Sequence, residues 1–339
     1  MPGNKSFLIT PELEGVFEDR DIPVPGPDEV IVKTKVTGIC GSDIHNYLEG
    51  KIGYYGFDKP YVPGHESSGV VCAVGEKVTR WKVGDNVIPE PGIPCHTCRH
   101  CLEGRYNMCD NYIFMSSSVR DGTFREYFNI REDMLHPMPE GMSFETGALA
   151  EPEAVAVHIC RRAGDLAGKR IVIFGLGPIG MLVGMTARAF GADKIICADI
   201  NADRLKKAAE YFADETVNTL ETPVPEETGE IVFETAGSPI TVAAAFHAAA
   251  KHGRIVQVGW LKNNVAQIDT SLMLSKELEY VASYNYYNDF PLAIELLAKH
   301  RIDAEKIITT RFPFNETKEA FDYTIANPKE VLKTLVIFS

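Results

Sequence analysis

Residues 169–180 read Lys-Arg-Ile-Val-Ile-Phe-Gly-Leu-Gly-Pro-Ile-Gly. The β-branched and aromatic run at 171–174 predicts a buried strand, and the apolar residues at 181–190 predict a helix directly afterwards. The glycines between them are Gly175, Gly177 and Gly180. A glycine pattern that ends a strand and opens a helix is typical of a site for the pyrophosphate of a dinucleotide.

Each glycine in this stretch has its own physical task. Gly175 permits the tight turn, Gly177 lets the backbone approach the pyrophosphate, and Gly180 lets helix and strand pack closely. The N–H groups at the start of the helix, where Pro178 and Ile179 stand, attract the negative charge of the pyrophosphate. We therefore expect the whole segment to bind the cofactor.

The next strand carries the second part of the cofactor signal. Residues 194–198 form a further apolar run, and Asp199 ends it. A carboxylate there can accept hydrogen bonds from the adenosine ribose and would repel a 2′-phosphate, so the sequence predicts NAD rather than NADP. The alternative is a glycine-rich turn in an α/β domain that binds no nucleotide, and the complete strand–helix–strand context disfavours it.

The wider pattern divides the chain. From about residue 152, strands alternate with helices such as the one expected at 241–251, which predicts a parallel sheet with crossover helices. Before that point, short apolar alternations such as 29–36 and 68–75 lie between proline and glycine clusters and predict a β-rich barrel or sandwich. Beyond about residue 283, the expected elements are helices at 290–299 and 317–327 and a strand at 332–337.

Length and charge narrow the functional classes. A chain of 339 residues suggests two domains, and a formal net charge of −13 opposes binding to nucleic acid or to an anionic membrane. The amino terminus does not resemble a signal peptide, and the sequence contains no apolar run long enough to span a membrane. We therefore expect a cytoplasmic protein with eight reduced cysteines, in which a tight cysteine cluster indicates a metal site.

One such cluster is the strongest local signal. Four cysteines follow one another with two, two and seven residues between them, namely Cys95, Cys98, Cys101 and Cys109. Four thiolates around a tetrahedral zinc form a closed site with no position for a substrate, so the expected ion is structural. A redox Cys-x-x-Cys pair is the competing interpretation, and four cysteines at this spacing fit metal better.

A second metal site is predicted at Cys40, His65 and Glu66. A thiolate, an imidazole and a carboxylate are ligand types of a catalytic zinc, and three protein ligands leave a fourth position for water or substrate. For Cys40 alone, a buried and inert thiol is the simpler interpretation. The segment that starts at Gly64 and contains His65 and Glu66, with Gly69, Gly75 and Val78 after it, resembles the zinc alcohol dehydrogenase signature of the medium-chain dehydrogenases.

Over essentially its full length, the chain resembles the sorbitol and xylitol (polyol) dehydrogenase branch of that family. The resemblance implies an α/β fold with a β-rich domain, in which residues 1–151 and 284–339 form a GroES-like zinc catalytic domain. A Rossmann NAD-binding domain, residues 152–283, is then inserted into it. The same resemblance implies two zinc ions per chain, NAD as cofactor, and a homodimer or homotetramer.

The resemblance also assigns roles to single residues. Glu151 lies beside the catalytic zinc in related enzymes, and either Glu66 or Glu151 completes the ligand set, with Glu66 favoured at rest. Ser42 and His45 relay the substrate proton to bulk water, which suits a histidine that titrates near neutral pH. Arg204 lies where relatives place an arginine near the adenosine. The simpler alternatives are a helix-terminal charge for Glu151, a solvated His45 and an exposed Arg204.

The substrate pocket departs from the family pattern. Tyr286 matches a family tyrosine, but Asn285 stands where the polyol enzymes have an arginine. A family tyrosine just after the relay histidine is replaced here by Asn46, with Tyr47 following, and Phe114 lies on the loop where the family places other pocket residues. A polar and aromatic pocket without a fixed cation suits a neutral polyhydroxylated substrate, and a cyclic polyol, an aminocyclitol or a threonine-type amino alcohol stays open.

The reaction implied is the reversible NAD-linked oxidation of a secondary alcohol to a ketone by hydride transfer. An enzyme similar to L-threonine 3-dehydrogenase or an aminocyclitol dehydrogenase is the enzymatic alternative. A non-enzymatic zinc- and NAD-binding relative is opposed by the intact set of metal ligands. A quinone-type reductase of the same fold is opposed by the cysteines and by Asp199.

Overall fold

The computed structural model describes residues 3–339. The chain forms two compact units. The first unit contains the residues up to Glu151 together with Phe290–Ala298 and Ala304–Ser339, and the second contains Pro152–Asp289 and Lys299–Asp303. Within residues 3–339, no helix has the length and apolar character needed to cross a membrane.

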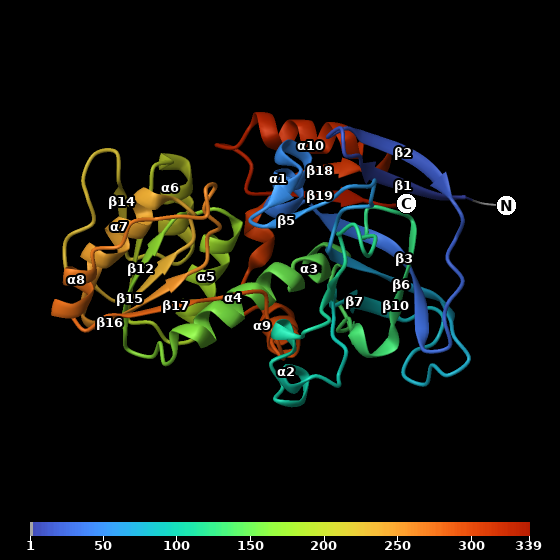
Figure 1. Ribbon diagram of the computed structural model, residues 1–339, viewed down its shortest axis with the longest axis horizontal. Helices are drawn as coiled ribbons and strands as arrows, with labels where there is room; N and C mark the ends of the chain where they lie inside the picture. The colour runs from blue at the N-terminus through green and yellow to red at the C-terminus, as the bar shows by residue number, and fades with distance from the viewer. Residues whose placement is uncertain (1–2) are drawn as a thin grey trace. The chain divides into compact units, whose positions relative to one another are not determined.

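The first unit is built on a mixed sheet in the order β11-β7-β6-β3-β19-β18, with β10 also paired to β3 (Figure 1). Its strands are β3 (Glu29–Gly38), β6 (Glu66–Val74), β7 (Asn86–Pro89), β10 (Tyr127–Arg131), β11 (Leu135–Pro137), β18 (Ile308–Pro313) and β19 (Lys333–Ile337). Val30, Ile31 and Val32 of β3 are all buried, so both faces of the strand are covered there, because successive side chains of a strand point to opposite faces. The last strand of the chain, β19, pairs antiparallel with β3, so that Leu335 lies opposite Gly38.

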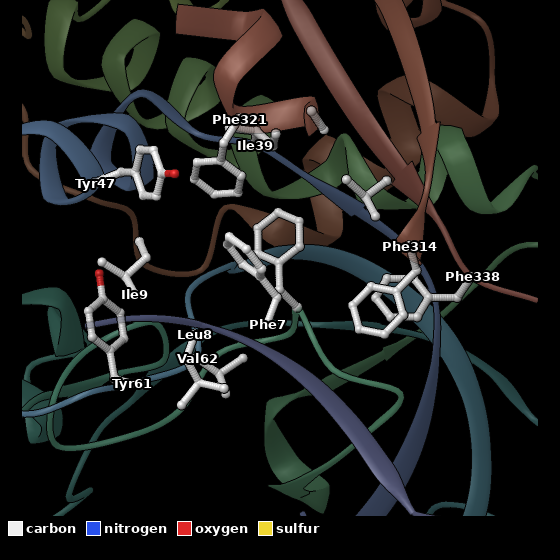
Figure 2. Packing of buried hydrophobic residues seen from close by; sticks show 13 residues of the cluster. Phe7, Leu8, Ile9, Ile39, Tyr47, Tyr61, Val62, Phe314, Phe321 and Phe338 are labelled. Atoms are coloured by element: carbon white, nitrogen blue, oxygen red, sulfur yellow. The ribbon is translucent and has the colours of Figure 1, made fainter. Parts of the chain in front are cut away.

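Aromatic side chains form a large part of the core of this unit (Figure 2). Phe7 from β1 (Asn4–Ile9) contacts Phe321 from α10 (Thr317–Ala326), with ring centroids 5.3 Å apart. Phe314 stacks on Phe338 at 4.1 Å. Burial of each such ring contributes roughly 1.5–3 kcal/mol, so the two ends of the sequence hold each other in place. Other elements of this unit are β2 (Gly15–Arg20), α1 (Gly41–Glu49), α2 (Arg99–Leu102), α3 (Phe144–Ala148) and α9 (Phe290–Ala298).

The second unit contains a parallel sheet in the order β14-β13-β12-β15-β16-β17 (Figure 1). Its strands are β12 (Arg170–Phe174), β13 (Lys194–Asp199), β14 (Glu215–Asn218), β15 (Gly229–Glu234), β16 (Ala249–Gln257) and β17 (Glu279–Ala282). Its helices include α5 (Pro178–Ala189), α6 (Ala202–Tyr211), α7 (Pro239–Ala248) and α8 (Thr270–Ser275), while α4 (Ala150–Ala163) starts in the first unit. The chain order reverses between β12 and β15, and such a switch point is where open α/β sheets bind ligands.

The predicted fold class, a β-rich domain combined with a parallel α/β domain, is confirmed. The helix predicted at 241–251 was too long, because α7 ends at Ala248 and β16 begins at once. The ammonium group of buried Lys276 explains this end: its Nζ donates to the carbonyl oxygens of Phe246, His247 and Ala249 at 3.3, 2.9 and 2.9 Å. Residues 284–289 and 299–303 are grouped with the second unit, whereas the family resemblance implied that they belong to the first.

Candidate metal centres and cofactor site

The four-cysteine cluster forms a compact set of sulfur atoms on the lobe that contains α2. Cys95 Sγ lies 4.0 Å from Cys101 Sγ, and Cys98 Sγ lies 3.5 Å from Cys101 Sγ. Together with Cys109, all four sulfur atoms lie within 4.8 Å of one another. A tetrahedral zinc with Zn–S bonds of about 2.3 Å separates its sulfurs by about 3.8 Å, so these residues fit a closed zinc site.

Backbone donors surround the same sulfurs. Cys95 N donates to Cys109 Sγ at 3.3 Å, and Cys98 N donates to Cys95 Sγ at 3.3 Å. A hydrogen bond from the Thr97 side chain, followed by backbone donors, lowers the pKa of Cys95 to about 5. All eight cysteines are free thiols; Cys160 and Cys197 are buried, and Cys72 is half-buried.

The second centre brings together Cys40, His65 and Glu66, whose ligand atoms lie within 4.8 Å of one another. Cys40 is the N-cap residue of α1, and Glu66 begins β6. His65 and Glu66 are 4% and 1% exposed. A thiol, an imidazole and a carboxylate that converge in the protein interior form the donor set of a catalytic zinc site with room for a further ligand.

The side chain of Asp43 connects the segments that carry this centre, and the sequence analysis assigned it no role. Its Oδ2 accepts from Cys40 N at 3.1 Å, and its Oδ1 accepts from Ser116 Oγ at 3.0 Å and from Gly64 N at 3.3 Å. The Nδ1 atom of His65 lies 3.8 Å from Asp43 Oδ1 and forms no hydrogen bond of its own. Asp43 therefore faces His65 Nδ1. In metal sites, a carboxylate in this position accepts from the ring nitrogen that does not bind the metal and so orients the histidine. Asp43 could have been recognised in the sequence as an acidic residue at the N3 position of a helix, where its side chain can accept from the N-cap backbone N–H.

Lys333 is the second residue that the sequence interpretation missed. Its Nζ lies 2.7 Å from each carboxylate oxygen of Glu66 and 3.2 Å from the carbonyl oxygen of Ile39. Both partners of this ion pair are almost fully buried. Lys333 comes from β19, which lies beside β3 in the sheet, and no local motif in the sequence marks it.

Two further predicted site residues of the first unit, Glu151 and Phe114, lie near this centre. Glu151 is buried. Burial by itself lowers the pKa of His65 and of Lys333, but the neighbouring groups together raise both pKa values, with Cys40 the largest contributor for His65, Glu66 the largest for Lys333, and Glu151 a smaller one for both. The ring of Phe114 lies 5.1 Å from that of His65. On α1, Ser42 is half-buried and His45 is exposed.

Three predicted pocket residues have different surroundings. Tyr47 is packed in the aromatic core, and its hydroxyl group donates to Asp322 at 3.4 Å, so the structure gives it a packing role (Figure 2). Tyr286 and Asn285 belong to the second unit, where Tyr286 is 1% exposed. Asn285 has a φ of 47°, in the left-handed region that asparagine tolerates better than most residues.

The glycine stretch has the geometry of a phosphate cradle. Gly175 has a φ of 91°, and a Cβ on Gly180 would lie 2.0 Å from the carbonyl oxygen of Gly175. A Cβ on Gly177 would meet nothing within 4 Å, which is the open space that a pyrophosphate needs. Gly177 is the N-cap of α5, with Pro178 and Ile179 in its first turn.

Asp199 ends β13, next to this cradle. Its Oδ2 accepts from Leu176 N at 2.6 Å, and its Oδ1 accepts from Asn201 N at 2.8 Å. The carboxylate therefore ties the glycine turn to the start of α6. Arg204 lies in the first turn of α6, where its backbone N–H donates to the side chain of Asn201 at 3.2 Å.

Comparison with known proteins decides the family. Residues 26–140 match the alcohol dehydrogenase GroES-like domain, and residues 178–299 match the zinc-binding dehydrogenase domain. The chain is 39% identical to sorbitol dehydrogenase 1 of Saccharomyces cerevisiae over 99% of both proteins. It belongs to the polyol branch of the zinc-dependent medium-chain dehydrogenases.

Further relatives agree with this assignment. The dehydrogenase is 38% identical to D-xylulose reductase A of Aspergillus clavatus over 99% of this chain and 97% of the relative. A protein from Escherichia coli CFT073 that is described as a short chain alcohol dehydrogenase, solved in complex with NADH, superimposes with a TM-score of 0.92 at 29% identity over 99% of each chain. The predicted family, the GroES-like and Rossmann fold class, and the assignment as a zinc-dependent oxidoreductase are confirmed.

Proposed function

We propose that this dehydrogenase oxidises a secondary alcohol of a neutral polyhydroxylated substrate to a ketone, with NAD as the cofactor and zinc at both cysteine-containing centres. The observation that carries the proposal is the buried convergence of Cys40, His65 and Glu66. In a chain related to sorbitol dehydrogenase 1, this donor set supports a catalytic ion with a free position for substrate.

Zinc held at this centre supplies a Lewis acid that lowers the pKa of the substrate hydroxyl group. Cys40 and His65 are the proposed ligands, and Asp43 orients the His65 ring. Glu66 is the proposed third ligand at rest, because its two carboxylate oxygens have more lone pairs than Lys333 can occupy. Glu151 is proposed to orient the reacting hydroxyl group, because its charge lies near enough to His65 to affect the pKa of that imidazole.

The proton released from the substrate is proposed to leave by way of Ser42 and His45. Positions three residues apart lie on the same side of a helix, and both residues lie in α1, which starts at the ligand Cys40. The imidazole of His45 is exposed, so it can pass a proton to bulk water. Ser42 is therefore the inner member and His45 the outer member of the proposed path.

NAD, when bound, would supply the hydride acceptor. The proposed contacts are the cradle at Gly175, Gly177 and Gly180 for the pyrophosphate, and Asp199 and Arg204 for the adenosine. Asp199 supports NAD over NADP, since its carboxylate at the end of β13 would repel a 2′-phosphate. The four-cysteine lobe is proposed to hold the second, structural zinc.

The substrate class rests on the side chains proposed for the pocket. Asn285, Tyr286 and Phe114 offer amide, hydroxyl and aromatic groups, and none of them carries a cation that would select a phosphate or a carboxylate. A neutral polyol or cyclitol fits this set. The exact neutral alcohol is open between linear and cyclic polyols, and an aminocyclitol or an amino alcohol is the alternative class of substrate.

A substrate panel with metal analysis tests the proposal. The purified protein is incubated with NAD and sorbitol, xylitol, inositols, an aminocyclitol or threonine, and NADH formation is followed by absorbance, with His65→Ala as the control. We expect a neutral polyol to be oxidised fastest, and zinc to be present in the wild type. If threonine or the aminocyclitol is oxidised fastest, the proposed substrate class is wrong. If none of the compounds is oxidised, the proposed reaction is wrong.

A further inference from the structure

Glu234 is a buried carboxylate that has no part in the proposed chemistry. It is the last residue of β15, where it lies opposite Phe174, the last residue of β12. It therefore stands at the carboxyl edge of the sheet, at the switch point between these strands. Its side chain is fully buried.

The Glu234 carboxylate accepts hydrogen bonds from the loop that follows its own strand. Its Oε1 accepts from the backbone N–H groups of Ala236 at 3.1 Å and Gly237 at 2.9 Å, and lies 2.7 Å from Thr241 Oγ1. These donors come from residues 235–238 and from the first turn of α7. A buried carboxylate with several donors holds a loop firmly, because charge-assisted hydrogen bonds are stronger than neutral ones.

Gln257 ties the same carboxylate to the next strand. Its Nε2 donates to Glu234 Oε2 at 2.6 Å and to the carbonyl oxygen of Gly259 at 2.8 Å, while its Oε1 accepts from Tyr280 Oη at 2.9 Å. Because both ends of the amide have partners, its orientation is determined. The carbonyl oxygen of Glu234 also accepts from the N–H groups of Val258 and Gly259 at 2.9 and 3.0 Å.

The two loops held in this way touch through their backbones. A Cβ on Gly237 would lie 2.3 Å from the carbonyl oxygen of Trp260, and a Cβ on Gly259 would lie 2.2 Å from Gly237 N. The first loop also reaches the glycine cradle, since Thr235 Oγ1 donates to the carbonyl oxygen of Gly175 at 2.7 Å. Small shifts of Glu234 or Gln257 would therefore move the loops at 235–238 and 258–260 together.

The order of strands indicates which part of the cofactor these loops face. The adenosine is assigned to the end of β13 through Asp199, and the pyrophosphate to the turn between β12 and α5. β15 lies on the other side of β12 from β13. A dinucleotide with its adenosine at β13 and its pyrophosphate at β12 therefore continues toward β15 and β16, where its nicotinamide half lies.

We propose that Glu234 and Gln257 act as a pair of positioning residues that hold the loops at 235–238 and 258–260 against the nicotinamide half of the cofactor. This inference rests on the proposed NAD function. Neither side chain touches the cofactor, so the pair acts through backbone groups of the two loops. A merely structural pair would instead weaken the binding of both cofactor halves equally, or of neither.

The direct test is Glu234→Gln. The amide side chain has nearly the same shape, but it presents N–H donors where Gln257 and Gly237 already donate, so the loops lose their common acceptor. We expect the dissociation constant for NADH to rise about tenfold. The constant for ADP-ribose, which lacks the nicotinamide, is expected to change less than about twofold, both measured by titration.

Matched variants separate this role from general damage. Glu230→Gln makes the same change in the same strand, where Glu230 pairs with Lys169 and Arg170 near the opposite edge of the sheet, and it should leave both constants unchanged. The double variant Glu234→Gln with Gln257→Glu exchanges donor and acceptor across the 2.6 Å contact. It should recover only part of the NADH affinity, because the new carboxylate at position 257 can no longer donate to the carbonyl oxygen of Gly259. If Glu234→Gln does not fold, Tyr280→Phe, which releases the amide of Gln257, should raise the NADH constant about threefold in the same assay.

The outcomes distinguish the two proposals. Equal losses for NADH and ADP-ribose, or no loss in Glu234→Gln, would overturn the positioning role while the NAD function stands. Failure of the double variant to recover any affinity would overturn the pairing of Glu234 with Gln257. A wild-type protein that binds neither NADH nor ADP-ribose would overturn the NAD function itself.

Discussion

At the scale of single residues, Lys333 is the side chain whose role the structure changes most. Its ammonium group neutralises Glu66 inside the protein, where an unpaired carboxylate would be costly. A divalent cation at the same centre would perform the same neutralisation. Lys333 and zinc therefore compete electrostatically for Glu66, although a carboxylate has lone pairs enough to contact both.

We expect Lys333→Met to destabilise the zinc-free protein by about 3–5 kcal/mol, because it leaves Glu66 buried without a cation. The zinc-loaded protein should lose clearly less, since the ion takes over the neutralisation. The measurement is urea unfolding of both forms, with Lys333→Arg as the variant that keeps the charge. Equal destabilisation of both forms would show that Lys333 is not linked to the metal centre.

Asp199 carries a prediction of its own at this scale. Asp199→Ala should reduce the preference for NAD over NADP by about tenfold or more, because the repulsion of the 2′-phosphate disappears. Part of the loss should fall on NAD, since Leu176 N and Asn201 N lose their acceptor. The ratio of kcat/KM for the two cofactors measures the effect.

The control is Asp203→Ala, which removes the same charge from an exposed position in the first turn of α6. This variant should leave the ratio within about twofold, as expected for a screened surface charge. A wild-type enzyme that already prefers NADP would contradict the assignment of Asp199.

At the scale of elements, the two cysteine-containing centres differ in how they are enclosed. The lobe around α2 supplies four thiolates from residues 95–109 and leaves no open position. The proposed ligands of the other centre come from the N-cap of α1 and from the start of β6 and include one carboxylate. Three protein ligands of this kind leave a fourth position on zinc open. Ligand number and type therefore predict that the two ions exchange at different rates.

A mild chelator should remove the ion at Cys40 and His65 first. Activity should then fall to background while about one zinc per chain remains. Zinc analysis, activity and the melting temperature are followed on the same samples, and Cys98→Ser should lose the retained ion instead. Simultaneous loss of both ions, or activity that survives the loss, would contradict the assignment of an open catalytic and a closed structural site.

At the scale of the whole molecule, the first unit is assembled from distant parts of the chain. β19 lies between β3 and β18 in the sheet, and Phe321 and Phe338 join Phe7 in the core. This pairing carries Lys333 to Glu66 across 267 positions of sequence. The carboxyl-terminal strand therefore contributes both to the stability of the sheet and to the composition of the metal centre.

Local patterns of sequence were sufficient for much of this protein. The cysteine lobe and the glycine cradle are encoded within short segments, so their spacing alone indicates a metal and a pyrophosphate. The division into a β-rich and an α/β part follows from the period of apolar residues, which depends on each strand or helix by itself. Asn285 was recognised as a departure from the family pattern, but its φ of 47°, which would cost an arginine about 1–2 kcal/mol, was not visible in the sequence.

Only the tertiary structure decided which side chains share a buried environment. Asp43 facing His65, Lys333 pairing with Glu66, and Gln257 binding Glu234 all depend on strand pairing and on loops that meet through space. The place of Tyr47 in the aromatic core likewise depends on residues that are distant in the sequence, such as Phe7 and Phe321. Hydrogen bonds and ion pairs act over a few ångströms in space regardless of separation along the chain, so the sequence by itself determined the ligand motifs and the element types, while the folded chain determined the partners of each charge.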